Sequence, residues 1–146
     1  MKKYTRICAR IDLDAIEYNL EMMRRRLPSD TKMIGVIKMD GYGHGAAQIA
    51  KYVMEEKDYI WGYAAATPDE AALLRKKGIQ KPILVLGCTF PEQRDEMIRQ
   101  EIRMTCYTEE MARDVSERAG RLGKTAYIHI KLDTGMSRLG FLISEE

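Results

Sequence analysis

The stretch YIWGYAAATPDEAALLRKKG, residues 59–78, decides the fold class of this chain. Its first half is a short apolar run that predicts a strand, and its second half has the apolar spacing of a helix. Thr67 and Glu70 have the spacing of a helix-capping box, Pro68 suits the first helical turn, and Gly78 suits the position after the last turn. The stretch therefore predicts one strand followed closely by one helix.

The chain opens with the same order of elements. Apolar residues alternate over residues 7–13, which predicts a strand, and then recur at helical spacing over residues 16–27. Asp14 and Glu17 have the spacing of a second capping box, so we expect this helix to begin at Asp14.

The unit recurs to the end of the chain. Further strands are expected within residues 32–39, 82–87, 102–107 and 126–133, and further helices within residues 45–56, 92–100 and 109–123, with Thr89 and Thr108 leading into the last two. Strict alternation with short turns indicates parallel strands covered by helices. The glycine-rich phosphate loop that opens a doubly wound sheet does not occur, so a (β/α)8 barrel is favoured over an open sheet.

Length limits how much of a barrel the chain can hold. A complete barrel takes roughly 250 residues, and the chain has 146. We therefore expect one α/β domain over residues 1–146, with about five of the eight barrel strands after an N-terminal strand and helix, as the N-terminal portion of a longer protein. A small open α/β sheet is the alternative.

Composition favours a small molecule or another protein chain as the partner. The 24 Lys and Arg residues nearly balance the 22 Asp and Glu residues, so no strong field attracts nucleic acid or an anionic membrane surface. Cys8, Cys88 and Cys106 are widely spaced without a metal-binding or disulfide pattern, which fits a reducing cytoplasm. No apolar run has the length of a signal-peptide core or a membrane span.

Lys38 is the first candidate site residue. It stands in VIKMDGYGHG, residues 36–45, as the last residue on a strand face shared with Ile34 and Val36. The carboxyl ends of barrel strands carry active-site side chains, although a solvated lysine at a strand end is the simpler alternative. The alternating glycines after Lys38 allow a main chain to approach a phosphate closely, and they are also common in turns.

The last expected strand carries four polar residues on one face: Tyr127, His129, Lys131 and Asp133. They would be costly inside a barrel unless they formed a hydrogen-bonded functional network. Arg138 follows in a glycine-flanked loop, and its guanidinium suits binding of a carboxylate or phosphate. A surface arginine without a binding role is the alternative. A lysine and an arginine aimed at one barrel end together indicate imine chemistry on an anionic substrate.

These segments resemble the alanine racemase family. VIKMDGYGHG is similar to the family's cofactor-lysine signature, and HIKLDTGMSRLGF, residues 129–141, is similar to its second hallmark segment. RIDLDAIEYNL, residues 10–20, also resembles the family's N-terminal segment, so the similarity extends in order over essentially the whole chain.

The resemblance implies a fold type III enzyme that uses pyridoxal 5'-phosphate, with an N-terminal (β/α)8 barrel, a C-terminal mostly-β domain and a homodimeric assembly. It implies that Lys38 bonds covalently to the cofactor and is the base on one face of the substrate. Tyr42 corresponds to a tyrosine that contacts the cofactor phosphate, and Arg138 to an arginine near the cofactor hydroxyl and the substrate carboxylate. Lys131 corresponds to a position that often carries a carbamylated lysine.

The chain departs from the family pattern at two places. Met39, Asp40 and Gly41 replace the usual Ala-Asn-Ala, and Ser137 replaces a common glycine. In the family pattern the opposite-face tyrosine base and the second domain follow residue 146, so we expect the chain alone to be inactive.

The resemblance implies racemisation of alanine, which supplies D-alanine for peptidoglycan precursors in a bacterial cytoplasm. A racemase of serine or another amino acid, a non-catalytic cofactor-binding or interaction module, and an inert fragment are the alternatives. No metal is expected. Because a partial barrel exposes strand edges and apolar faces, we also expect the chain to self-associate.

Overall fold

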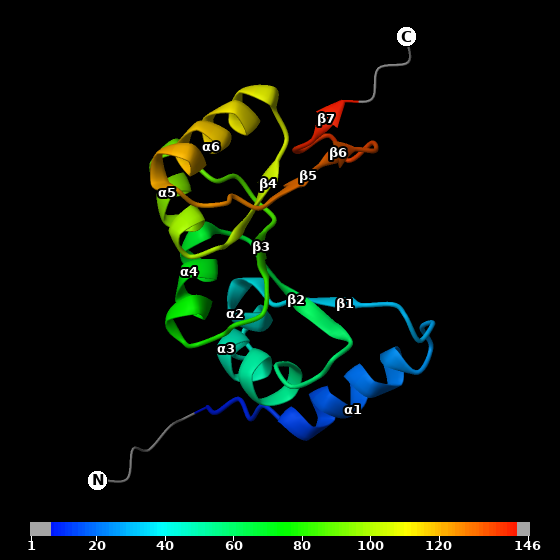
Figure 1. Ribbon diagram of the computed structural model, residues 1–146. Helices are drawn as coiled ribbons and strands as arrows, with labels where there is room; N and C mark the ends of the chain where they lie inside the picture. The colour runs from blue at the N-terminus through cyan, green and yellow to red at the C-terminus, as the bar shows by residue number, and fades with distance from the viewer. Residues whose placement is uncertain (1–6, 143–146) are drawn as a thin grey trace, which may run out of the picture.

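The computed structural model describes residues 7–142, which form an α/β fold (Figure 1). The five-stranded sheet contains β1 (Met33–Val36), β2 (Ile60–Ala65), β3 (Ile83–Val85), β4 (Arg103–Cys106) and β5 (Ile128–Ile130). A second sheet pairs β6 (Leu132–Asp133) with β7 (Phe141–Leu142). The helical segments are α1 (Leu13–Arg24), α2 (Lys38–Tyr42), α3 (Ala46–Ile49), the π-helix η1 (Ala50–Met54), α4 (Pro68–Lys76), α5 (Pro91–Arg99) and α6 (Glu109–Leu122).

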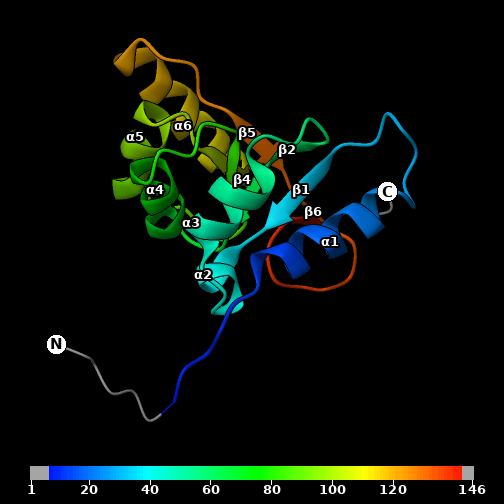
Figure 2. The same cartoon turned by 90° about the horizontal axis from the view of Figure 1, so that it is seen from below.

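The order of strands in the large sheet follows the order of the chain. All neighbouring pairs from β1 to β5 are parallel. Helices α3 to α6 stack along one side of this sheet in both views (Figure 1, Figure 2). A doubly wound sheet would reverse its strand order and carry helices on both faces. The arrangement is that of a barrel wall, which confirms the predicted five-strand portion of a (β/α)8 barrel.

The two faces of the large sheet differ in burial. Ile83, Val85 and Met104 are fully buried on the face that packs against the helices, where they belong to the hydrophobic core. On β1, Ile34 and Val36 point the other way and are 41% and 47% exposed. Burial of apolar surface under the helices therefore holds the wall together, and the inner face is partly exposed where it reaches the edge strand β1.

Threonine caps begin two helices, as the sequence predicts. Thr67 Oγ1 accepts a hydrogen bond from the Glu70 N–H at the start of α4, and Thr108 Oγ1 accepts one from the Met111 N–H at the start of α6. Each cap satisfies a main-chain donor that has no partner inside the helix. None of the helices in residues 7–142 is long and apolar enough to cross a membrane.

The helix expected within residues 92–100 is confirmed as α5 (Pro91–Arg99), but Thr89, which was expected to lead into it, is not its cap. Phe90 is the N-cap residue and Pro91 is the first helical residue. Proline suits this position because its missing N–H is one that the first helical turn leaves without a partner. Thr89 is instead buried, and its carbonyl accepts a hydrogen bond from the Arg94 guanidinium at 3.2 Å.

The N-terminal strand expected over residues 7–13 is not formed. Residues 7–12 have no regular secondary structure, and Ile7 is 90% exposed. An alternating pattern becomes a strand only where a neighbouring strand accepts its main-chain hydrogen bonds. Helix α1 follows and is capped by Asp12, not Asp14, because the Asp12 carboxylate accepts a hydrogen bond from the Ala15 N–H at 3.0 Å.

Helix α1 is attached to the loop before β2 by charged and polar contacts. Lys57 Nζ lies 2.6 Å from a Glu17 carboxylate oxygen and 2.9 Å from one of Glu21. The Tyr59 hydroxyl donates a hydrogen bond to Glu21 at 2.6 Å. Burial and this hydrogen bond raise the pKa of Tyr59 to about 12, so its hydroxyl keeps the donated proton at neutral pH.

Candidate functional site

A cavity of about 660 Å³ opens at the carboxyl-terminal ends of the strands in the large sheet. The segments that follow β1, β2 and β3 contribute to its lining, together with β4, the end of β5 and the loop before β7. This edge of a parallel barrel is the one that carries active sites. The polar side chains of the lining are Lys38, Thr105, His129, Lys131 and Arg138.

Lys38 begins a left-handed turn at the edge of this cavity. The prediction that it is the last inward residue of a strand is wrong, because β1 ends at Val36 and the chain then turns. All four residues 39–42 have φ angles between 53° and 63°. A left-handed conformation costs roughly 1–2 kcal/mol for each residue other than glycine. The surrounding structure must therefore stabilise this turn.

Two carboxylates hold the turn. Glu70 accepts a hydrogen bond from the Met39 N–H at 3.0 Å through one oxygen and from the Ala66 N–H at 2.8 Å through the other. Asp40 accepts a hydrogen bond from the Ala46 N–H at 2.9 Å, where α3 begins. The sequence pattern around Glu70 indicates only a helix-capping role. The capping-box spacing is the one sequence signal at Glu70, and this spacing does not reveal which main-chain N–H groups the Glu70 side chain contacts.

His44 belongs to the same turn. Its Nδ1 lies 3.0 Å from the Gly41 carbonyl oxygen and 3.1 Å from the Tyr42 carbonyl oxygen. An Nδ1–H placed between two carbonyls donates to both. The motif histidine therefore stabilises the main chain beside Lys38.

The strand expected over residues 126–133 is divided in two. β5 ends at Ile130, whereas β6 begins at Leu132 and pairs with β7 outside the large sheet. Phe141 donates its main-chain N–H to the Lys131 carbonyl at 2.8 Å, which fixes the junction. The junction leaves Lys131 in the cavity lining.

Arg138 lies in a loop that Asp133 organises. The Asp133 carboxylate accepts hydrogen bonds from the main-chain N–H groups of Ser137 at 3.0 Å and Gly135 at 2.9 Å. These bonds stabilise the ionised carboxylate and lower the pKa of Asp133. Ser137 has a φ of 57°, at the position where glycine is common in the family that the sequence resembles.

His129 is an uncharged member of the lining at neutral pH. Burial, and then the neighbouring Arg103 charge, lower the pKa of His129. Its ring packs against Trp61, with the ring centroids 5.9 Å apart. The Arg103 guanidinium lies 4.8 Å from the Trp61 ring centroid and 4.6 Å from that of Tyr127, so cation–π contacts stabilise its charge.

The cavity brings together three of the four predicted site residues, namely Lys38, Lys131 and Arg138. Tyr42 lies outside the lining and is 61% exposed, with its ring centroid 5.9 Å from Lys38 Nζ. Among the described residues that line the cavity there is no Asp or Glu, so the charges favour an anionic ligand. Residues 7–142 contain no group of three or more His, Cys, Asp or Glu side chains that could hold a metal ion.

Comparison with known proteins reveals similarity over nearly the whole chain. The family model described as "Alanine racemase, N-terminal domain" matches residues 11–146. Alanine racemase 1 of Clostridium acetobutylicum is 44% identical over 140 residues, which cover 96% of this chain and 36% of the relative. The chain spans about a third of the length of the curated relatives that it matches.

Solved structures share the fold. An alanine racemase of Clostridium difficile 630 has a TM-score of 0.88 at 42% identity, covering 92% of this chain and 35% of that protein. A histidine racemase from Leuconostoc mesenteroides subsp. sake NBRC 102480 has a TM-score of 0.77 at 27% identity, covering 89% of this chain and 34% of that protein.

Proposed function

Because this chain belongs to the alanine racemase N-terminal domain family, we propose that it forms the cofactor-binding barrel portion of an alanine racemase that uses pyridoxal 5'-phosphate. The observation that carries the proposal is the presence of Lys38 and Arg138 in one cavity, although Lys38 follows the edge strand β1 and Arg138 lies in the loop between β6 and β7, beyond the other edge strand β5. Since the chain spans about a third of its curated relatives, racemisation is proposed for a protein that contains this chain.

The lining of the cavity fits such a cofactor. Lys38 offers an amine for the cofactor aldehyde, and the cationic side chains of Lys131 and Arg138 favour anionic groups. The neutral ring of His129 and the apolar side chain of Leu84 offer surface for a flat ring. When bound, the cofactor supplies an electron sink for the negative charge that proton loss leaves on the substrate α-carbon.

The remaining roles belong to residues of this chain. Lys38 would bind the cofactor covalently and then move a proton at one face of the α-carbon, which requires the neutral amine. Arg138 would bind the substrate carboxylate through the two parallel N–H donors of its guanidinium. Tyr42 is assigned to the cofactor phosphate, and its exposed ring would have to turn toward the cavity for this contact.

Lys131 is assigned to carbamylation. Its neutral amine would add to the carbon of carbon dioxide, forming an N–C bond and releasing one proton, so that an anion stands in the same lining as Arg138. The chain incubated with ¹³C-bicarbonate should show a carbamate carbon signal in NMR that disappears in Lys131→Arg. A signal that survives this substitution would remove the assignment.

We assign alanine as the substrate, D-alanine for peptidoglycan precursors as the product, a homodimer as the assembly and a bacterial cytoplasm as the location. A racemase of another amino acid is the second candidate, because the histidine racemase shares this fold over 89% of the chain. Comparing racemisation rates of alanine, serine and histidine by a protein that contains this chain would separate the two candidates.

The cofactor site is tested directly on the purified chain. After mixing with pyridoxal 5'-phosphate and removing the excess, we expect a visible absorption band, and borohydride should then attach the cofactor permanently to the peptide that contains Lys38. Lys38→Ala should abolish both signals. Lys51→Ala is the matched control, because Lys51 Nζ lies 5.7 Å from the Tyr52 ring, much as Lys38 lies beside Tyr42. A band that persists in Lys38→Ala, or that Lys51→Ala removes equally, would contradict the proposal.

A further inference from the structure

The main chain directly after Lys38 is held by a side chain from another element. Glu70 lies in the first turn of α4, and its two carboxylate oxygens accept hydrogen bonds from Met39 and Ala66. Met39 follows Lys38, and Ala66 follows the end of β2. One carboxylate thus connects the carboxyl ends of two neighbouring strands at the cavity.

Glu70 replaces the strand-to-strand hydrogen bonds at the point where the chain turns. Ile37 still donates its N–H to the Ala64 carbonyl at 3.0 Å, as in the β1–β2 pairing. Two residues later, Met39 has entered the left-handed turn and donates its N–H to Glu70 instead. The Glu70 carboxylate therefore accepts the hydrogen bond that the Met39 N–H would have donated to a carbonyl of the β2 chain if β1 had continued as a strand.

Main-chain hydrogen bonds from Gly41 to the Ile37 carbonyl and from Gly43 to the Met39 carbonyl form the turn itself, whereas the other side-chain contacts lie farther from Lys38. The Met39 side chain is 66% exposed, so its packing contributes little to the conformation. The Asp40 carboxylate binds the Ala46 N–H, and His44 binds the Gly41 carbonyl. Glu70 is thus the side chain that holds the main-chain N–H of Met39, the residue next to Lys38.

We propose that Glu70 is a positioning residue for Lys38. Its carboxylate holds the left-handed turn and so fixes the point from which the Lys38 amine enters the cavity. A charged acceptor suits this role, because two N–H donors can share one carboxylate, and because a negative charge is favoured at the amino end of α4. The role of the Lys38 amine in this inference rests on the proposed function. The stabilisation of the turn by Glu70 can be measured without any cofactor.

Glu70→Gln is the variant that tests the proposal. Glutamine keeps the size of the side chain but presents an NH₂ group to one of the two N–H donors, so one hydrogen bond is lost. Asp69→Asn is the matched control, because it removes the same charge from the same first turn of α4, where Asp69 is exposed. Thr67→Ala is a second control, because it removes the α4 cap and leaves both Glu70 acceptor oxygens in place.

Two measurements are made on the wild-type chain and the three variants. The first is amide hydrogen exchange over residues 37–45 without cofactor. The second is the apparent affinity for pyridoxal 5'-phosphate, followed by the absorption band that requires Lys38. We expect Glu70→Gln to speed the exchange and to weaken the affinity by roughly tenfold, as for the loss of one hydrogen bond to a charged group. Asp69→Asn and Thr67→Ala should match the wild type over residues 37–45.

The outcomes distinguish the two proposals. Equal exchange in Glu70→Gln and Asp69→Asn would overturn the positioning role, as would faster exchange with unchanged affinity. If the wild-type chain gives no band that depends on Lys38, the proposed function fails, whereas selectively faster exchange in Glu70→Gln would still support the hold of Glu70 on the turn.

Discussion

The Asp133 carboxylate accepts a hydrogen bond from the Ser137 main-chain N–H, 3.0 Å away. This contact, together with the one from Gly135, closes the loop that carries Arg138. The cationic side of the cavity therefore depends on an acidic residue that is not in the cavity lining.

Replacing Asp133 by Ala should loosen this loop. We expect faster amide hydrogen exchange over residues 134–140 and roughly tenfold weaker binding of pyridoxal 5'-phosphate, because Arg138 loses its fixed position. Main-chain hydrogen bonds lower the pKa of Asp133 from its ordinary value of 3.8. Their contribution to the stability of the folded loop is therefore complete above pH 3.8 and is lost as the pH falls through the lower pKa of the folded chain. Asp30→Ala, an exposed acidic control, should leave both measurements unchanged.

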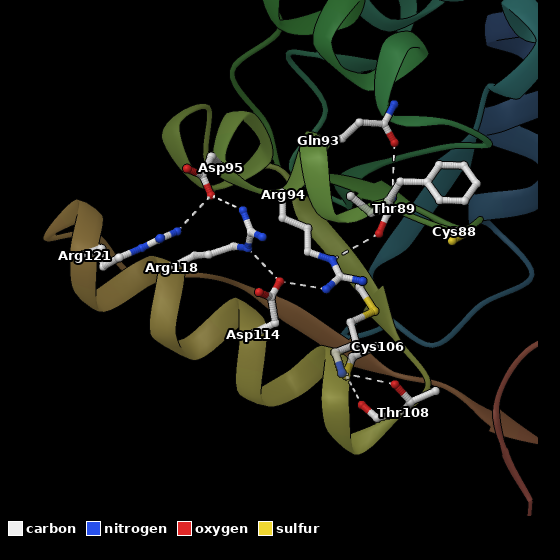
Figure 3. A network of polar contacts seen from close by, with 12 residues as sticks. Cys88, Thr89, Gln93, Arg94, Asp95, Cys106, Thr108, Asp114, Arg118 and Arg121 are labelled. Carbon is white, nitrogen blue, oxygen red and sulfur yellow. Dashed lines mark hydrogen bonds and ion pairs between the residues drawn. The ribbon is translucent and has the colours of Figure 1, made fainter.

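An ion-pair network joins α5 to α6. Arg118 lies between Asp95 and Asp114, and Arg94 also contacts Asp114 (Figure 3). The Arg118 guanidinium is 2.8 Å from an Asp95 oxygen and 2.7 Å from an Asp114 oxygen. Arg118→Met should lower the free energy of unfolding by about 1 kcal/mol, because the Arg118 side chain is only 21% exposed and contacts two carboxylates. The matched Arg113→Met should change it by about 0.3 kcal/mol or less, since its pair with Glu109 is exposed.

This network also predicts a dependence on pH. Arg118 lowers the pKa values of Asp95 and Asp114 from their ordinary 3.8. A lowered carboxylate pKa stabilises the folded chain above the unfolded value and ceases to do so as pH falls through the folded value. The difference in thermal midpoint between wild type and Arg118→Met should therefore be constant above about pH 5 and shrink below pH 3.8. A difference that persists at pH 2 would mean that lost packing, not charge, explains the variant.

Two glycines should respond in opposite directions to alanine. At Gly62 in β2, an added Cβ would clash with the Pro82 carbonyl oxygen, so Gly62→Ala should destabilise the chain by about 2 kcal/mol. At Gly120 in α6, an added Cβ meets no atom within 4 Å, so Gly120→Ala should stabilise it by about 0.5–1 kcal/mol. Denaturant unfolding measures both changes, and a Gly62→Ala variant as stable as the wild type would contradict the close approach of β2 to Pro82.

The two edge strands of the large sheet predict self-association of the chain. Ile34 and Ile128 lie on the two edge strands and are 41% and 37% exposed. Edge strands with exposed apolar side chains pair readily with another copy. Light scattering should show a molar mass that rises with concentration and that falls in the double variant Ile34→Lys, Ile128→Lys. Tyr18→Lys on α1 is the control. A wild-type chain that stays monomeric at all concentrations would contradict this prediction.

The regular part of the wall could be predicted because its signals are local. The strand–helix unit over residues 59–78 appears as β2 and α4, and the Thr67 and Thr108 caps form as their spacing indicates. The expected strand at residues 7–13 was wrong for a different reason. The alternation of apolar and polar residues shows which side chains could share one face of a strand. Strand formation also needs a partner strand, which this pattern does not specify.

The sequence by itself determined the repeating order of strands and helices, the family, and the identity of the cationic residues that reach the cavity, because these depend on short-range spacing and motif chemistry. Only the tertiary structure decided that Lys38 stands on a left-handed turn and that Glu70, far along the chain, holds the main chain beside it. It also decided that the last strand divides at Lys131 and that Tyr42 lies outside the cavity lining. These features depend on where distant main-chain donors find acceptors, and local residue patterns do not contain that information.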